Sequence, residues 1–156
     1  GACNRGRVGD LATCRSLRTP RAAPVYIRRA RRKAPSCGSA IRAAAHEDIN
    51  LLTVLPAATA DGLQVLGMDD EWGDVACNAD RIVINTGDML SECTNGYFRA
   101  TKHRVVNPEG SGSSESRLSM PLFLHPRDDV QLSDRHTAGS YRLERYKELG
   151  LAPKED

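Results

Sequence analysis

The sequence predicts a mainly β protein that ends in a helix, and three stretches carry this prediction. The apolar run INLLTVL, which Pro56 ends, is typical of a buried strand. The run RIVIN predicts a second strand. The turn residues TGD follow it, and we expect Gly87 in this turn to have a positive φ. Near the end, AGSYRLERYKEL predicts a helix that Thr137 caps and Gly150 closes.

Shorter segments between these stretches follow the same β pattern. LQVLG and EWGDVAC predict a hairpin around an acidic turn at residues 68–70. We expect a loop over Ser91 to Gly96 and then a strand from Tyr97 to Val106. A Gly/Ser-rich loop over residues 107–116 should lead to a last strand, RLSMPLFLHP.

The composition fits one soluble domain, because 156 residues can bury a hydrophobic core. The five cysteines are odd in number and lack CxxC or zinc-finger spacing, so they indicate neither a disulfide framework nor structural zinc. We therefore expect a reducing, cytoplasmic location. No apolar run approaches the roughly 18 residues that span a bilayer, so we expect no membrane partner.

Residues 1–40 differ from the rest of the chain in being basic and without a sustained apolar period. Residues 1–45 contain 11 Lys and Arg side chains but one acidic residue, Asp10. Three functional interpretations of this basic segment stay open: a nucleic-acid-binding arm, a transit peptide and a contact with an anionic membrane. No interleaved aromatic residues and no amphipathic face support them. We expect residues 1–40 to be disordered or to be non-native sequence from a truncated or frame-disrupted gene, and residues 152–156 to form a tail.

Three side chains are candidate metal ligands. His46 and Asp48 lie two apart at the head of the β-like run from Ile41 to Pro56, so both can point to one face of a strand. His103 lies in a later β-branched segment that could pair beside this run. Two histidines and one carboxylate form a facial triad, which leaves three coordination positions open and suits non-haem Fe(II).

Arg117 and Ser119 form a second candidate pair, again two apart on one strand face. Arginine offers a planar fork for a carboxylate, and serine adds a hydroxyl donor beside it. The alternative for Arg117 is a surface salt bridge with an acid such as Glu115.

The segments HED, INTGDML, KHRVVNP, RLS and LFLHPRDDVQLSDRHTAGSY occur in this order between residues 41 and 151. In this order they closely resemble the C-terminal half of the isopenicillin N synthase-like family of Fe(II)/2-oxoglutarate oxygenases. The resemblance implies a double-stranded β-helix (jelly-roll) core over residues 41–151, which we expect to be incomplete because residues 1–40 do not match the family. It also implies that His46, Asp48 and His103 bind Fe(II), and that Arg117 and Ser119 hold the distal carboxylate of 2-oxoglutarate.

The implied activity is that of a dioxygenase that uses molecular oxygen, with 2-oxoglutarate as cosubstrate, to oxidise an unidentified small molecule. Hydroxylation is the default reaction. Two alternatives stay open at this point. One is oxidative ring closure without 2-oxoglutarate, with Arg117 and Ser119 holding a carboxylate of the substrate. The other is a truncated remnant that only binds metal.

Overall fold

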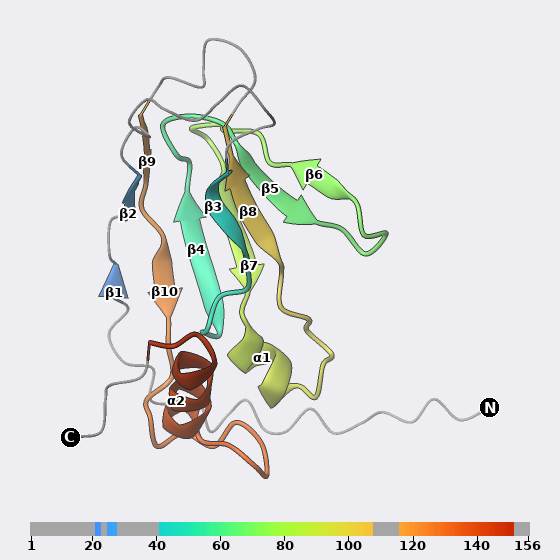
Figure 1. Cartoon of the computed structure of the whole chain (residues 1–156), viewed down its shortest axis with the longest axis vertical. Coiled ribbons are helices and arrows are strands. Elements are labelled where there is room, and N and C mark those ends of the chain that lie inside the picture. Colours follow the sequence, from blue (N-terminus) through green and yellow to red (C-terminus); the bar gives the residue numbers. More distant parts are fainter. Residues whose placement is uncertain (1–20, 23–24, 28–40, 108–115, 152–156) are drawn as a thin grey trace.

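Figure 1 shows a computed structural model of the chain, which describes residues 21–22, 25–27, 41–107 and 116–151. The expectations for most of residues 1–40, for the loop at 108–115 and for the tail at 152–156 concern residues outside these ranges.

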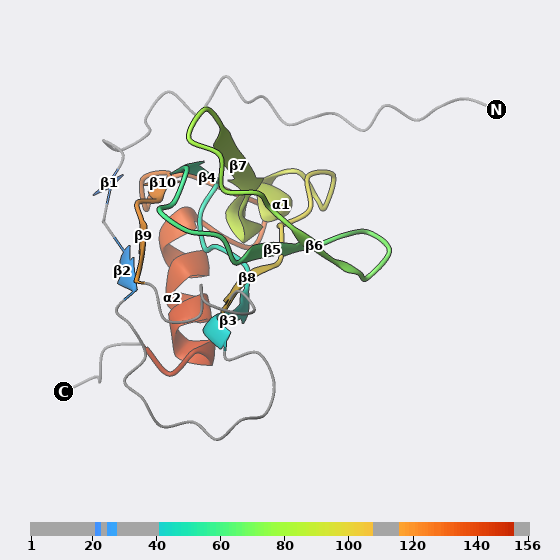
Figure 2. The ribbon, with the colours of Figure 1, turned by 90° about the horizontal axis from the view of Figure 1, so that it is seen from above.

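Two four-stranded antiparallel sheets form the body of the described structure (Figures 1 and 2). The first sheet has the order β1 (Arg21–Ala22), β10 (Leu122–Leu124), β4 (Leu52–Pro56), β7 (Ile82–Thr86). The second has the order β3 (Ile41–His46), β8 (His103–Val106), β5 (Leu63–Leu66), β6 (Trp72–Asp74).

Consecutive strands pass back and forth between the two sheets, which is the topology of a jelly roll. The chain goes from β3 in the second sheet to β4 in the first, then to the β5–β6 hairpin, and returns through β7 to β8. The hairpin is the one predicted around residues 68–70, and Asp70 in its turn has a left-handed φ of 61°. The prediction of a mainly β, jelly-roll fold with a C-terminal helix is confirmed.

Two short strands lie within the segment for which we expected no native structure. β1 pairs with β10, with Arg21 opposite Phe123, and β2 (Val25–Ile27) pairs with β9 (Arg117–Ser119). The two pairings belong to separate sheets, and Pro121, which has no amide hydrogen to donate, lies between β9 and β10. The edge of the first sheet is therefore built from residues before the domain boundary that we expected at residue 41.

Side chains on β4 and β7 alternate between the interior and the outside of the jelly roll. The register places Thr53 opposite Asn85 and Val54 opposite Ile84. Thr53 is 3% exposed and Ile84 is 64% exposed. The side chains of the paired residues Thr53 and Asn85 therefore point into the jelly roll, and those of Val54 and Ile84 point away from it. The interior of the first sheet thus carries polar groups inside otherwise apolar strands.

A short helix, α1 (Asp88–Cys93), begins where a turn was predicted and extends into the expected loop. Gly87 precedes it with a φ of −101°, so the predicted positive φ is wrong. Close packing requires the glycine instead, because a Cβ there would lie 2.2 Å from Oδ1 and 2.3 Å from the carbonyl oxygen of Asn50. The backbone N–H groups of residues 87, 88 and 89 donate to the carbonyls of Leu51, Asp48 and Asn50 respectively.

The apolar core lies where α1 and α2 (Ala138–Glu148) pack below the strands in Figure 1. Its buried members are Met89, Leu132, Ala138 and Tyr141. The predicted C-terminal helix is confirmed, and a reciprocal capping box joins Thr137 to Ser140 at its start. Within the described ranges, no helix is both long enough and apolar enough to cross a membrane.

Candidate metal centre

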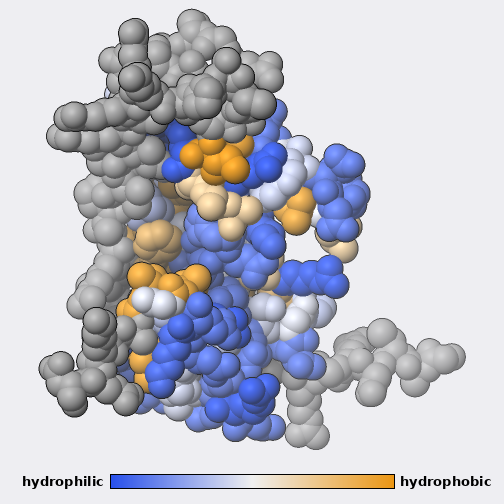
Figure 3. All heavy atoms as spheres, in the orientation of Figure 1, coloured by the Kyte–Doolittle hydropathy of each residue, from blue (hydrophilic) through white to orange (hydrophobic). Residues whose placement is uncertain are grey.

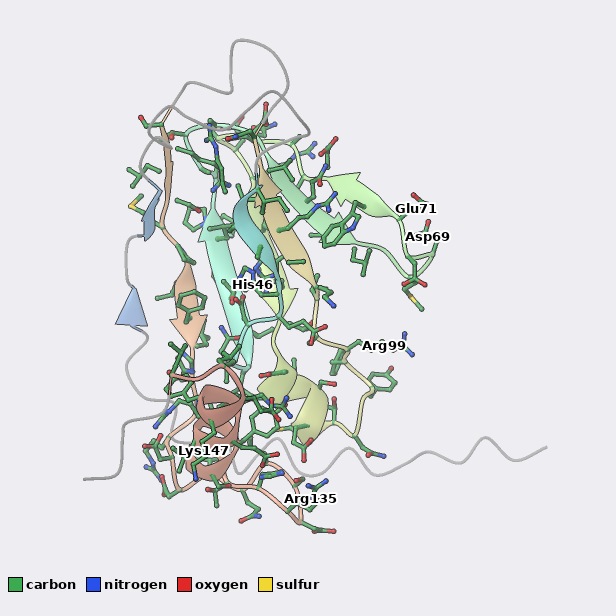
Figure 4. The ribbon with its side chains drawn as sticks, viewed as in Figure 1. His46, Asp69, Glu71, Arg99, Arg135 and Lys147 are labelled. Atoms are coloured by element: carbon green, nitrogen blue, oxygen red, sulfur yellow. The ribbon has the colours of Figure 1, made fainter. Side chains whose placement is uncertain are left out.

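Two histidines lie side by side at one end of the second sheet. His46 is the last residue of β3, His103 is the first residue of β8, and the antiparallel register makes them direct partners. Their ring centroids are 4.3 Å apart, and Figure 4 shows His46 in the middle of the strands. The run from Ile41 to Pro56 is divided into two strands. His46 therefore ends β3 and Asp48 lies in the connection to β4, whereas we predicted both at the head of one strand.

Both imidazole rings are oriented in the same way by the backbone. Nδ1 of His46 lies 2.8 Å from the carbonyl oxygen of Ala44, and Nδ1 of His103 lies 2.9 Å from that of Thr101. A carbonyl oxygen only accepts, so in each pair Nδ1 carries the hydrogen and donates it. Each Nε2 then keeps its lone pair for a metal, which is the usual arrangement of metal-binding histidines.

Asp48 completes the cluster with its two oxygens in different surroundings. Oδ1 lies 3.8 Å from Nε2 of His46 and 3.8 Å from Nε2 of His103. Oδ2 points away from the rings and accepts hydrogen bonds from Thr53 Oγ1 at 2.5 Å and Asn85 Nδ2 at 2.9 Å. The carboxylate is thus held with one oxygen toward the histidines.

The cluster fits a small cation in both geometry and chemistry. One ligand atom from each of the three side chains lies within 4.8 Å of the others, and ligand bonds are roughly 2 Å long, so small side-chain rotations bring all three to one ion. Two neutral nitrogens and one carboxylate oxygen suit Fe(II). The side chain of His46 is 48% exposed, compared with 15% for His103 and 8% for Asp48, so the cluster opens on the side of His46.

A hollow of about 1670 Å³ lies beside the cluster. It is bounded by the turn of the β5–β6 hairpin and by the segment between α1 and β8, and its wall includes Glu47 and Thr101. Figure 3 shows the opening below the hairpin, and Figure 4 places Arg99 across it from Asp69 and Glu71. The hollow reaches immediate neighbours of the candidate ligands, although the ligands themselves do not line it.

Arg117 and Ser119 lie on β9, outside the sheet that carries the two histidines, and they share one strand face as predicted. They are 3% and 7% exposed, so Arg117 is not a surface side chain; Glu115, the acid named as its alternative partner, lies outside the described residues. Arg117 donates from Nε to the carbonyl of Ala60 at 2.9 Å and lines a small cavity of about 20 Å³. Burial is the main cause that lowers the pKa of Arg117 from its ordinary value, so an anionic partner would relieve an unfavourable environment.

Sequence reasoning missed the residues that hold Asp48. Thr53 and Asn85 contact it directly, and Nδ2 of Asn50 donates to Thr53 Oγ1 at 2.8 Å. Their signal in the sequence is the presence of polar side chains inside the apolar runs INLLTVL and RIVIN. Buried polar groups of this kind need partners, and here the partner is a candidate metal ligand.

Comparisons with known proteins agree with this geometry. The sequence model of the 2OG-Fe(II) oxygenase superfamily matches residues 26–126, a range that begins in β2 and includes all five candidate residues. A solved structure of a putative oxygenase from Shewanella oneidensis is 55% identical, with a TM-score of 0.67, over 77% of this chain and 44% of that one. A putative 2OG-Fe(II) oxygenase family protein from Caulobacter crescentus is 32% identical, with a TM-score of 0.65, over 81% of this chain and 44% of that one.

Among curated proteins, feruloyl CoA ortho-hydroxylase F6H1-1 from Ipomoea batatas is 35% identical over 96 residues. This match covers 61% of the chain but 26% of the relative, so the chain spans about a quarter of that protein's length. The family match nevertheless covers most of the described structure, from within β2 to just beyond the end of β10. The chain belongs to the 2OG-Fe(II) oxygenase superfamily.

Proposed function

We propose that this chain forms the metal- and cosubstrate-binding part of a non-haem Fe(II)/2-oxoglutarate-dependent dioxygenase that hydroxylates a small molecule. The observation that carries this proposal is the convergence of His46, Asp48 and His103, with ligand atoms within 4.8 Å of one another and both Nε2 lone pairs available. Membership of the superfamily supports the choice of Fe(II) and 2-oxoglutarate.

The three clustered side chains would hold Fe(II) from one side. Bound Fe(II) and 2-oxoglutarate supply a redox-active centre with open positions and the two electrons that, with those of the substrate, reduce molecular oxygen. The protein's own part is to keep each imidazole in the tautomer that presents Nε2, through the carbonyls of Ala44 and Thr101. It also keeps one carboxylate oxygen, Oδ1 of Asp48, directed at both rings.

We assign Arg117 and Ser119 to the distal carboxylate of 2-oxoglutarate. A guanidinium at 3% exposure whose pKa is lowered by burial has much to gain from a buried anion, and Ser119 on the same face adds a hydroxyl donor. The cavity of about 20 Å³ beside Arg117 is the size of a single water, so the side chains around it must move apart to admit a carboxylate.

The substrate class is a small organic molecule, and hydroxylation is the reaction we favour. The relative from Ipomoea batatas is named as an ortho-hydroxylase, and a second curated relative, from Arabidopsis thaliana, is named gibberellin 2-beta-dioxygenase 3. Oxidative ring closure is therefore not favoured. A reducing compartment such as the cytoplasm stays a prediction from the cysteine pattern.

Titration of the anaerobic protein with Fe(II) and 2-oxoglutarate tests the proposal without knowledge of the substrate. We expect a weak visible absorption band that requires both additions, and slow formation of succinate once oxygen is admitted. His46→Ala and His103→Ala should abolish the band. His136→Ala is the matched control. His136 lies just before α2, and its Nε2 is 3.6 Å from Glu144 Oε2 of that helix, so this variant should keep the band.

The band and the succinate separate the candidate functions. An Fe(II)-dependent signal that does not respond to 2-oxoglutarate would refute the assignment of Arg117 and leave a metal-binding remnant or a cyclase. Absence of Fe(II) binding in the folded protein would refute the proposed function as a whole.

A further inference from the structure

We propose that Thr53 and Asn85 are positioning residues that keep Asp48 a one-oxygen ligand and so preserve the open positions of the metal. The inference rests on the proposed function, because it concerns the same metal. It assigns a role to two residues of the first sheet, which lies opposite the sheet that carries the histidines.

The contacts to Oδ2 of Asp48 come from two adjacent strands. Thr53 on β4 donates from Oγ1 at 2.5 Å, and Asn85 on β7 donates from Nδ2 at 2.9 Å. The register of β4 and β7 makes these two residues direct partners, so both donors project inward from the same level of the sheet. Two donors on one oxygen use the lone pairs that this oxygen would otherwise offer to a metal.

The hydroxyl of Thr53 has a defined direction because of a third residue. Nδ2 of Asn50 donates a hydrogen bond to Thr53 Oγ1 at 2.8 Å. The hydroxyl group of Thr53 therefore accepts from Asn50 and donates its one hydrogen bond to Oδ2 of Asp48. Asn50 is fully buried and lies against Gly87, where no side chain could fit. The chain of hydrogen bonds therefore starts from the buried, tightly packed side chain of Asn50 and ends at Oδ2 of Asp48.

The consequence for the metal follows from counting coordination positions. A carboxylate can bind a metal through one oxygen or through both. A triad that uses one oxygen of Asp48 leaves three positions, which is the number needed for two atoms of 2-oxoglutarate and one of molecular oxygen. If Oδ2 were released and also bound the metal, it would take one of these three positions.

Binding of Co(II), used alone as an oxygen-stable probe in place of Fe(II), tests the inference. We expect Thr53→Val and Asn85→Leu each to weaken Co(II) binding by about 10- to 100-fold, the usual effect of removing a partner of a metal ligand. The visible band of bound Co(II), which reports coordination number, should also change. Thr53→Ser keeps the hydroxyl and should restore both the affinity and the band.

Thr94→Val is the matched control. Thr94 is half-buried and its hydroxyl donates to the carbonyl of Leu90 at 2.8 Å, so this variant also removes a hydroxyl hydrogen bond but none that reaches Asp48. It should bind Co(II) like the wild type. Thermal melts of every variant identify any that does not fold, and because Thr53 and Asn85 lie on different strands, either one alone is a sufficient test.

Three outcomes are decisive. If the wild type and both variants bind Co(II) with equal affinity and the same band, the positioning role is refuted while the proposed function stands. If Thr53→Ser behaves like Thr53→Val, loss of packing and not loss of the hydrogen bond is responsible, and the inference again fails. If the folded wild type does not bind Co(II), both the inference and the proposed function are refuted.

Discussion

Replacing Asp88 with asparagine should remove a pH dependence that the structure builds into the junction of the two helices. Asp88 is the first residue of α1 and is half-buried. Burial raises the pKa of Asp88 from its ordinary value of 3.8 to about 6, and the charge of Arg145 and a hydrogen bond with Tyr141 offset only part of this rise. The folded state therefore binds the proton more tightly than the unfolded state does.

The sign and the size of the effect follow from linkage. The stabilising contribution of protonated Asp88 is complete below pH 3.8 and is lost as the pH rises through about 6. At about 1.36 kcal/mol per pKa unit the full difference is about 3 kcal/mol. Because Asp88 is only half-buried, screening by water should reduce this to about 1 to 2 kcal/mol. Asparagine keeps the shape without the charge, so the variant should be more stable than the wild type at pH 8 and equal to it near pH 4.

Urea unfolding at intervals between pH 4 and pH 8, with chelator present, measures this difference directly. Subtracting the free energy of unfolding of the variant from that of the wild type at each pH removes the contributions of all other titrating groups. A flat difference for Asp88→Asn across this range would refute the argument that burial dominates the environment of this side chain.

Three further predictions concern the cosubstrate, the close packing at Gly87 and the C-terminal helix. Arg117→Ala should weaken 2-oxoglutarate binding by about 2 to 5 kcal/mol and leave Fe(II) affinity nearly unchanged, with Arg117→Lys intermediate, as measured by titration of the anaerobic absorption band. Gly87→Ala should lower the free energy of unfolding by about 1 to 3 kcal/mol, because the new Cβ overlaps Asn50, whereas Gly73→Ala meets no atom closer than 4.0 Å and should cost far less. Thr137→Ala should destabilise the protein by about 1 kcal/mol in a thermal melt through loss of the capping box, and Thr137→Ser should recover most of this.

The cluster of His46, Asp48 and His103 could be predicted because metal binding depends on few residue types, and because two of the three ligands lie only two residues apart. The convergence itself required more than spacing, since the pairing of β3 with β8 joins residues that are far apart in the chain. Local pattern also placed Asp48 on a strand, whereas the chain turns after His46 and Asp48 reaches the rings from that turn.

The features that could not be predicted are those fixed by tertiary contacts. β1 and β2 are two and three residues long and lie in a segment rich in Arg, Ala and Pro, so no local pattern marks them, and only pairing with β10 and β9 makes them strands. Gly87 illustrates the same limit, because glycine in a turn suggests a positive φ but here relieves contact with Asn50. The alternation that put Arg117 and Ser119 on one face is local, and it was predicted correctly.

The ladder between β1 and β10 has a consequence for synthesis of the protein. Phe123, the partner of Arg21, is encoded about 100 residues later in the chain. At typical ribosomal rates of about 5 to 20 residues per second, the first strands leave the ribosome roughly 5 to 20 s before their partners exist. During this interval β4 and β7 can already pair with each other, since no residue of either comes after position 86. Closing the edge of the first sheet is therefore expected to be a late step in folding, completed only after β9 and β10 have emerged.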